Sequence, residues 1–424
     1  MLYPNLEIID HHLYFNHKDC VELAKKYQTP LYVMDEDRII EHCQKYLEYT
    51  NKYIGKDTII LYASKACDFK YLYEIINSQG LHVDVVSPCE LHIALKAKID
   101  PNKIHYHGNN KSDEDIIFGI KNHVGYFIVD SYDELMAIDR IAKAYGTKQK
   151  ILLRITPGID PHTHKKIATG IVDSKFGTLI HSADNMIKQA LSLDNIILEG
   201  FHCHIGSQLF DIEPYLDTID IMFDFINNIK HEFKCNILDL GGGFPVRYTD
   251  NDPDIDQESY IKKIGDKIKQ CQSKYQLYPT IAIEPGRSIV ADAGITIYTI
   301  GSVKQVNNKT YVSIDGGMSD NPRYALYDAK YSIIVANKAD HKKEILCTIA
   351  GRCCESGDLI QENIMLPDVK RNDIIAVLTT GAYNYSMASH YNQNQPLPVV
   401  MIKNDKDFIV VKRPSYDEMM KDML

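Results

Sequence analysis

Short apolar segments that end in polar residues or glycine recur eight times between residues 59 and 286. Helix-length stretches separate most of them, and several begin with a helix start signal, such as Ser112 and Ser131 with an acidic residue three positions later. Strands that alternate with helices pair in parallel, so eight units over about 250 residues predict a closed (β/α)8 barrel, with an open doubly wound sheet as the alternative. The eight segments are Ile59 to Lys65, Val83 to Ser87, Ile104 to Gly108, Tyr126 to Asp130, Ile151 to Arg154, Leu198 to His204, Ile237 to Gly243 and Ile281 to Gly286.

The pattern changes after residue 290. Apolar runs at Ile295 to Val303 and Thr310 to Ile314 flank two asparagines, which predicts a β-hairpin, and further strand-like runs with short turns follow. A chain of 424 residues is also too long for one ordinary core. We therefore predict an α/β protein: a (β/α)8 TIM barrel over residues 36–290, and an antiparallel β-domain over residues 291–424 that is completed by N-terminal strands within residues 1–35.

Composition narrows the class of protein. Hydrophobic residues at 45% and charged residues at 25% are typical of a soluble globular protein, and a net charge of −10 argues against nucleic-acid binding. No apolar run approaches the roughly 20 residues of a membrane helix, and the first residues lack the features of a signal peptide, so we expect a cytoplasmic protein. Ten cysteines without a C-x-x-C motif predict neither a zinc site nor a disulfide framework.

Polar residues gather at the predicted strand ends, where barrels of this kind place their active sites. Lys65 follows the first apolar run. A lone lysine at a strand end more often reaches solvent, but a partly desolvated one has a lowered pKa and becomes a nucleophile toward an aldehyde. Residue 65 alone leaves both interpretations open. A long connection, Thr156 to Ser192, also begins with a predicted loop over residues 156–180 that is more often functional than idle.

The other strand ends offer a phosphate site. Gly241 to Gly243 and Glu284-Pro285-Gly286 could cradle an anion with backbone N–H groups, and Ser207 could add a hydroxyl, although tight turns use glycine just as readily. Together with Lys65 these residues match pyridoxal 5′-phosphate, with Glu284 at the pyridine nitrogen and His204 on the ring face. Another interpretation of His202 and His204 is a structural or metal-binding pair, but without a distant partner they make a poor zinc site.

Motifs across the chain resemble those of the diaminopimelate decarboxylases, a family of pyridoxal-phosphate enzymes. In the barrel they are Tyr62-Ala-Ser-Lys-Ala66, Asp84-Val-Val-Ser87, His107-Gly-Asn-Asn-Lys111, His202-Cys-His-Ile-Gly-Ser-Gln208, Leu240-Gly-Gly-Gly-Phe244 and Glu284-Pro-Gly-Arg-Ser288. Beyond it they are Asp315-Gly-Gly-Met318, Arg323 with Ala325-Leu-Tyr327, Cys354-Glu-Ser-Gly-Asp358, Gly381-Ala-Tyr383 and Ser386-Met-Ala-Ser389. The resemblance spans residues 62 to 392 and implies decarboxylation at the D-centre of meso-diaminopimelate, which gives L-lysine and CO2.

The resemblance also implies roles for individual residues. Lys65 bonds to the cofactor, and Cys354 donates a proton to the carbon that loses CO2. Cys354 and Glu355 reach the cofactor of the other subunit, so that two complete sites require a homodimer. The implied catalytic residues are Lys65, Cys354, His204 and Glu284; the implied cofactor-binding residues are Lys65, His204, Ser207, Gly242, Gly243, Glu284, Pro285, Gly286, Arg287 and Tyr383; and the implied substrate-binding residues are Arg287, Arg323, Tyr327, Glu355 and Tyr383.

Taken singly, these residue types have simpler interpretations. Either arginine could be an ordinary surface residue, Cys353 and Cys354 could be two core thiols, and Glu355 could be a solvated carboxylate. The 28 tyrosines make any one of them uninformative as a residue type. The sequence also departs from the family pattern beside its motifs, without removing a chemical group named above, at Cys67, Cys89, Tyr324 and Arg352.

Other functions remain as alternatives. Ornithine, arginine and carboxynorspermidine decarboxylases share this kind of barrel, but simple diamino acids have no distal carboxylate for a pair of arginines to bind. The motifs are not those of an alanine racemase. A non-catalytic carrier of pyridoxal phosphate would lack the β-domain, and an aldolase that used Lys65 on a sugar phosphate would lack the visible absorption of the cofactor.

Overall fold

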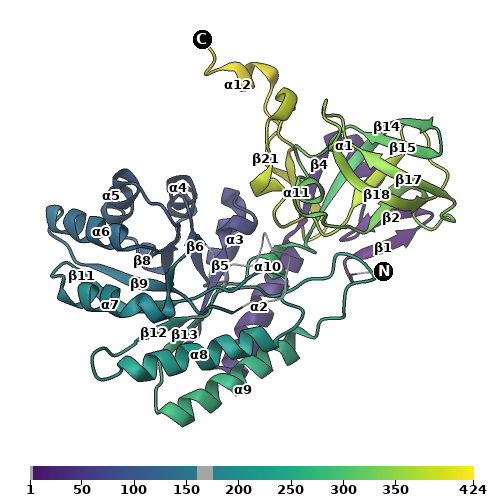
Figure 1. Ribbon diagram of the computed structural model, residues 1–424. Coiled ribbons are helices and arrows are strands. Elements are labelled where there is room, and N and C mark those ends of the chain that lie inside the picture. Colours follow the sequence, from purple (N-terminus) through teal and green to yellow (C-terminus); the bar gives the residue numbers. More distant parts are fainter. Residues whose placement is uncertain (1–2, 160–174) are drawn as a thin grey trace. The chain divides into compact units, whose positions relative to one another are not determined.

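A computed structural model describes residues 3–159 and 175–424 of the chain, which divide into two compact units (Figure 1). The barrel unit comprises residues 42–245 and 255–286, and the β unit comprises residues 1–41, 246–254 and 287–424. Much of the predicted loop over 156–180 falls on residues 160–174, which lie outside the described residues. The remainder of that connection contains the short strand β10 (Thr178–Leu179) and the turn Ile180–Ser182.

Eight parallel strands close the barrel, as predicted. They follow the order β9-β11-β12-β13-β5-β6-β7-β8, and β8 pairs with β9, so the open-sheet alternative is wrong. Each predicted apolar segment forms one strand: β5 (Ile59–Ala63), β6 (His82–Val85), β7 (Ile104–Tyr106), β8 (Tyr126–Val129), β9 (Gln149–Thr156), β11 (Ile196–His202), β12 (Ile237–Asp239) and β13 (Thr280–Ile283). Buried side chains from five of these strands pack together, namely Leu61, Ile128, Leu152, Ile237 and Ala282.

Helices follow the strands along the chain, and their start signals explain where they begin. Ser112 accepts from the backbone of Asp115 in a reciprocal capping box, as the sequence predicts. Ser131 caps the next helix, but Glu134 does not complete the box, because its carboxylate accepts from the Asp130 N–H and from Lys111. The helices are α2 (Glu36–Tyr53), α3 (Lys70–Ser78), α4 (Pro88–Lys96), α5 (Asp113–Lys121), α6 (Tyr132–Ala144), α7 (Ala183–Ser192), α8 (Glu213–Ile229) and α9 (Gln257–Tyr275).

The β unit is built on a sheet with the strand order β18-β17-β15-β14-β4-β20-β21. The N-terminal strand β4 (Leu31–Asp35) lies between β14 and β20, so N-terminal residues complete this sheet, as predicted. The predicted hairpin is β14 (Gly294–Val306) and β15 (Lys309–Ile314). Most pairings are antiparallel, but β4 with β20 and β15 with β17 are parallel. The other strands of the unit are β1 (Leu6–Ile9), β2 (His12–Phe15), β3 (Lys18–Asp19), β16 (Ile333–Val335), β17 (Ile345–Ala350), β18 (Leu359–Leu366), β19 (Ile374–Val377), β20 (Val399–Lys403) and β21 (Lys406–Val411).

Two short helices of the β unit, α10 (Arg287–Val290) and α11 (Arg323–Tyr327), each begin with a buried arginine. A third, α12 (Tyr416–Met420), lies near the C-terminus and begins with a capping box at Ser415. Buried residues from β2, α1 (Cys20–Tyr27), β4, β14 and β20 form one apolar cluster that includes Leu13, Leu23, Val33, Ile297 and Val400. The β unit therefore has a core of its own.

A buried ion pair holds the start of the β7–α5 connection in the barrel unit. The Lys111 Nζ lies 2.7 Å from Glu134 Oε1, and the two side chains are only 2% and 5% exposed. The Lys111 ammonium also donates to the carbonyls of Gly108 and Ile128 at 2.9 Å. Within the family motif at residues 107–111, Lys111 therefore has a structural role.

Replacing Lys111 by methionine is expected to lower the free energy of unfolding by about 3–5 kcal/mol, because it leaves the Glu134 carboxylate buried without its partner. Urea unfolding measures the change. The exposed Lys148→Met serves as the control and should shift stability by less than about 0.5 kcal/mol. Equal stabilities for the two variants would contradict the assignment.

Candidate active site

The lysine singled out in the sequence lies in a tight turn at the end of β5. Its neighbour Ser64 is fully buried and held twice: the Ser64 N–H donates to Asp84 Oδ1 at 3.0 Å, and the Ser64 hydroxyl donates to Glu90 Oε2 at 3.1 Å. Glu90 also accepts from the Val86 N–H at 2.6 Å. The Lys65 side chain itself is exposed in the single chain. The backbone beside the lysine is therefore fixed, while its amine stays accessible.

His204 lies beside the glycine triplet and carries no charge. Its Nδ1 accepts from the Gly242 N–H at 3.2 Å, which leaves the proton of the neutral imidazole on Nε2. Burial, and secondly the charge of Lys65, hold the pKa of His204 well below its usual range. The structure therefore brings Lys65, His204 and Gly242 together at the C-terminal ends of three barrel strands, as the sequence predicts.

Glu284 follows β13 and is flanked by two imidazoles. His107 Nε2 lies 3.0 Å from Glu284 Oε1, and His202 Nε2 lies 3.3 Å from Glu284 Oε2. Burial alone would raise the pKa of Glu284, but His202 and His107 hold it well below its usual range. The pKa values of Asp84 and Asp239 are instead raised, first by burial and then by the charge of Glu284. Glu284 is thus the carboxylate of this group that keeps its charge.

The same three groups could also be considered as metal ligands. One ligand atom from each of His107, His202 and Glu284 lies within 4.8 Å of the others, and all three residues are buried. His202 Nε2 forms a hydrogen bond with Glu284 Oε2, whereas His107 Nε2 and Glu284 Oε1 are close but form no hydrogen bond. Sequence reasoning found His107 and His202 at strand ends but gave neither a role toward Glu284, because the three residues are far apart along the chain.

Three glycines allow the loops after β12 and β13 to approach neighbouring backbone closely. A Cβ on Gly242 would lie 2.3 Å from the carbonyl oxygen of Glu284, and one on Gly243 would lie 2.7 Å from that of Gly206. A Cβ on Gly286 would lie 2.7 Å from the Ala63 side chain. Gly243 also has a φ of +110°, which side chains disfavour. Ser207, which follows Gly206, is half-buried.

Pyridoxal phosphate fits this set of residues. This cofactor requires four kinds of group. They are an accessible amine, here at Lys65, a neutral imidazole, a buried carboxylate that stays charged, and glycine loops without side chains over them. The cradle is built by the backbone, since a Cβ at residue 242, 243 or 286 would clash with Glu284, with Gly206 or with Ala63.

A second cluster, within the β unit, joins both predicted arginines to tyrosines. Arg287 Nη1 donates to the hydroxyl of Tyr248 at 2.6 Å, and the Arg287 guanidinium lies 4.6 Å from the ring centre of Tyr383. Arg323 Nη1 donates to the hydroxyl of Tyr331 at 2.7 Å. Tyr383 has a φ of +61°, a conformation that is costly for an aromatic residue and typical of functional sites. Tyr248 and Tyr331 had no sequence signal that set them apart from the other tyrosines.

The remaining predicted residues also lie in the β unit. Cys354 and Glu355 are exposed in the loop between β17 and β18, and the Cys354 N–H donates to Asn392 Oδ1 at 2.7 Å. The neighbouring Cys353 is buried, and burial raises the pKa of its thiol. Tyr327 is half-buried at the end of α11.

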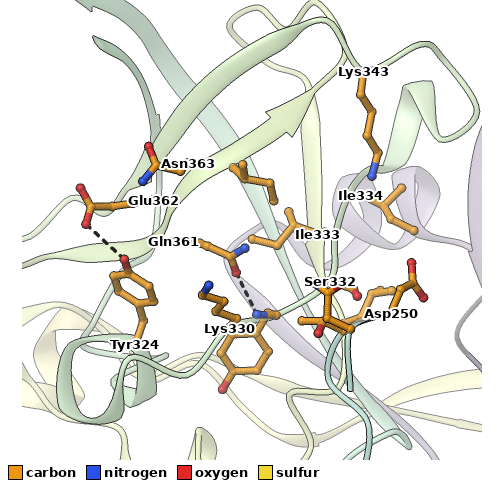
Figure 2. Close-up of a pocket in the computed structure, with 15 residues that line it drawn as sticks. Asp250, Tyr324, Lys330, Ser332, Ile333, Ile334, Lys343, Gln361, Glu362 and Asn363 are labelled. Atoms are coloured by element: carbon orange, nitrogen blue, oxygen red, sulfur yellow. Dashed lines mark hydrogen bonds between the residues drawn. The ribbon is translucent and has the colours of Figure 1, made fainter. Parts of the chain in front are cut away.

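A pocket of about 720 Å³ lies on the β unit. Figure 2 shows residues that line it. Tyr331 and Tyr324 both line it: the Tyr331 N–H donates to Gln361 Oε1 at 2.8 Å, and the Tyr324 hydroxyl donates to Glu362 at 3.2 Å. Tyr324, one of the departures from the family pattern, therefore contributes to a pocket wall. None of the predicted site residues lines this pocket.

Comparison with known proteins identifies the class. The sequence profile described as "Pyridoxal-dependent decarboxylase, pyridoxal binding domain" matches residues 36–291. A diaminopimelate decarboxylase of Bacillus subtilis is 41% identical over 97% of this chain and 94% of its own length, and one of Bacillus methanolicus is 43% identical over 95% and 94%. The crystal structure of the Methanocaldococcus jannaschii diaminopimelate decarboxylase in complex with L-lysine superposes with a TM-score of 0.92, at 34% identity, over 99% of this chain and 98% of that one.

The fold and the barrel site thus define a pyridoxal-dependent decarboxylase. Within that class, the chain belongs to the diaminopimelate decarboxylase family. The predicted function, pyridoxal-phosphate-dependent decarboxylation of meso-diaminopimelate to L-lysine and CO2, is confirmed by this membership, and so is the fold class. Across residues 3–159 and 175–424, no helix combines the length and the apolarity that crossing a membrane would require.

The buried His107 gives a test of the electrostatics at Glu284. Burial lowers its pKa to about 4, against about 6.5 in the unfolded chain, although Glu284 acts to raise it. The unfolded state therefore binds more protons than the folded state between these two pH values. As the pH falls from 7 to 5, His107 lowers the free energy of unfolding by about 2 kcal/mol.

Between pH 7 and pH 5, His107→Asn should therefore lose less free energy of unfolding than the unmodified protein. Urea titration at the two pH values measures both losses. The exposed His231→Asn is the matched control and should keep the original pH dependence. An unchanged difference between the two pH values in His107→Asn would show that His107 titrates normally.

Proposed function

We propose that the barrel cluster holds the cofactor and that the arginine–tyrosine cluster binds the substrate, with the residue roles that the family resemblance implies. The observation that carries the proposal is the barrel rim, where an accessible Lys65 meets a neutral His204 and a charged Glu284 over glycine turns. When bound, pyridoxal phosphate supplies an electron sink for the pair that departing CO2 leaves behind.

The barrel residues hold the cofactor and fix its charge. The Lys65 amine would bond to the aldehyde carbon, and Glu284 would pair with the pyridine nitrogen and keep it protonated. His204 would cover one face of the ring, where a neutral imidazole adds no charge to oppose that protonation. Ser207, Gly242, Gly243 and Gly286 would hold the phosphate, with Pro285 fixing the last turn.

Residues of the β unit bind and protonate the substrate. Arg287 and Arg323 bind the carboxylate of the centre that does not react, because a guanidinium offers a permanent charge and paired donors. Tyr327 would assist them, and Tyr383 would lie beside the bound cofactor. Glu355 binds the distal ammonium, and the Cys354 thiol donates its proton to the carbon that has lost CO2.

The protein acts as a homodimer in this proposal. Cys354 and Glu355 are exposed on a loop of the single chain, which suits residues that complete the site of a second subunit. We further propose residues 36–290 as the cofactor-binding domain along the sequence, with 1–35 and 291–424 as the β-domain; residues 36–41, 246–254 and 287–290 pack with the β unit. We propose the cytoplasm as the location of the protein. All ten cysteines are free thiols, and reducing compartments keep cysteines in this state.

Mixing two inactive variants tests the shared site. Lys65→Ala should lose nearly all turnover, and Cys354→Ala should slow turnover while it keeps the visible absorption of the bound cofactor. After subunit exchange, an equimolar mixture should regain about a quarter of normal activity, since half of the dimers then contain one complete site out of two. CO2 release from meso-diaminopimelate measures the recovery.

A control mixture tests whether the recovered activity depends on the position of the second substitution. Lys65→Ala mixed with Cys353→Ala, which alters the buried neighbour, should show only the activity of the Cys353→Ala subunits. If exchange is demonstrated by tagged subunits and the Lys65→Ala and Cys354→Ala mixture stays inactive, sites shared across the dimer are ruled out.

A further inference from the structure

Tyr248 contacts both arginines of the β unit. Its hydroxyl accepts the hydrogen bond of 2.6 Å from Arg287 Nη1, and its ring centre lies 4.6 Å from the guanidinium carbon of Arg323. Tyr331 contacts Arg323 from another side through its own hydroxyl, at 2.7 Å. The rings of Tyr248 and Tyr331 meet edge to face, with centroids 5.5 Å apart and an angle of 83° between their planes. Two cations and two phenols thus form one packed group.

Both cations of this group are buried. Arg287 and Arg323 are each only 6% exposed. Within the part of the chain that the structure describes, Arg323 makes its hydrogen bond and ring contacts to tyrosines and forms no ion pair with a carboxylate. A buried guanidinium without an anion is costly, because phenols and ring faces replace only part of its hydration. A ligand carboxylate would supply the missing charge.

The backbone, rather than the arginines, fixes the position of Tyr248. Its N–H donates to Asp252 Oδ2 at 2.7 Å, and its carbonyl accepts from the Ser332 N–H at 3.0 Å. Asp252 accepts from the Thr249 N–H as well, at 2.8 Å, which tightens the turn. The same Ser332 bond joins the Tyr248 segment to the strand that follows Tyr331. Tyr248 is therefore a pre-set support against which both arginines pack.

We propose that Tyr248 is a positioning residue for the known reaction: it sets the spacing and orientation of the Arg287 and Arg323 guanidinium groups and thereby selects ligands with a carboxylate at the centre that does not react. The inference rests on the proposed role of these arginines in carboxylate binding. The hydroxyl orients Arg287, the ring face supports Arg323, and Tyr331 secures the other side of Arg323.

Tyr248→Phe separates these two functions, because it keeps the ring and removes only the hydroxyl. In the holoenzyme, the KM for meso-diaminopimelate should rise about tenfold, the loss expected for one hydrogen bond to a charged group, while kcat changes less than threefold. Equilibrium binding of L-lysine, which keeps the carboxylate, should weaken by a similar factor. Binding of cadaverine, which has no carboxylate, should not change, and neither should the visible absorption of the cofactor.

A matched control removes another phenol from the same unit. Tyr27 donates from its hydroxyl to Asp407, away from the arginines, so Tyr27→Phe should leave both the KM and the L-lysine affinity unchanged. Tyr331→Phe provides a second test through Arg323 and should produce the same selective loss for ligands with a carboxylate. Circular dichroism and cofactor content establish that each variant is folded.

Two different failures can be told apart. If Arg323→Gln leaves the KM and L-lysine binding unchanged, the proposed carboxylate role of the arginines is wrong. If Arg323→Gln weakens both by more than a hundredfold but Tyr248→Phe and Tyr331→Phe behave like the unmodified enzyme, only the positioning role fails. Equal losses for L-lysine and cadaverine in Tyr248→Phe would also overturn it, because they would indicate a general defect in the site.

Discussion

One constraint governs the barrel rim: an amine must stay accessible and fixed among buried titratable groups. The chain meets it by anchoring Ser64 rather than the lysine itself, since Asp84 and Glu90 hold the backbone and hydroxyl of Ser64. Around this anchor the charges are distributed unequally. Glu284 keeps its charge, and burial leaves His204 neutral. The rim therefore offers a nucleophile and, in Glu284, a carboxylate that stays charged, which suits a cofactor with a basic ring nitrogen.

In the β unit, two buried cations lie close together, and Arg323 has no carboxylate partner among the described residues. Tyrosines contact both cations with their hydroxyls and ring faces, and they leave the guanidinium groups able to attract a carboxylate. In the proposed division of roles, the barrel provides for the loss of CO2, and the arginine–tyrosine cluster recognises the part of the substrate that remains.

Much of the fold could be predicted from the sequence, because the spacing of apolar residues and the position of turn residues are local signals. All eight barrel strands, the hairpin at Asn307 and the place of β4 follow from apolar runs and turns. Strand β18 escaped notice because it is a half-polar edge strand that is interrupted at Asn363, which has a φ of +54°. Lys65 and the glycine turns stood out for the same local reasons. The imidazoles at Glu284, the anchors of Ser64 and the support from Tyr248 did not, because each joins segments that only folding brings together.

Covalent attachment at Lys65 is the claim on which the rest depends, and chemical trapping tests it most directly. The holoenzyme is reduced with borohydride and digested, and the peptides are mapped by mass spectrometry. The account predicts a reduced pyridoxal phosphate adduct on the peptide that contains Lys65, in about one copy per chain. An adduct on another lysine, or an unmodified Lys65 peptide from protein that holds the cofactor, would contradict it.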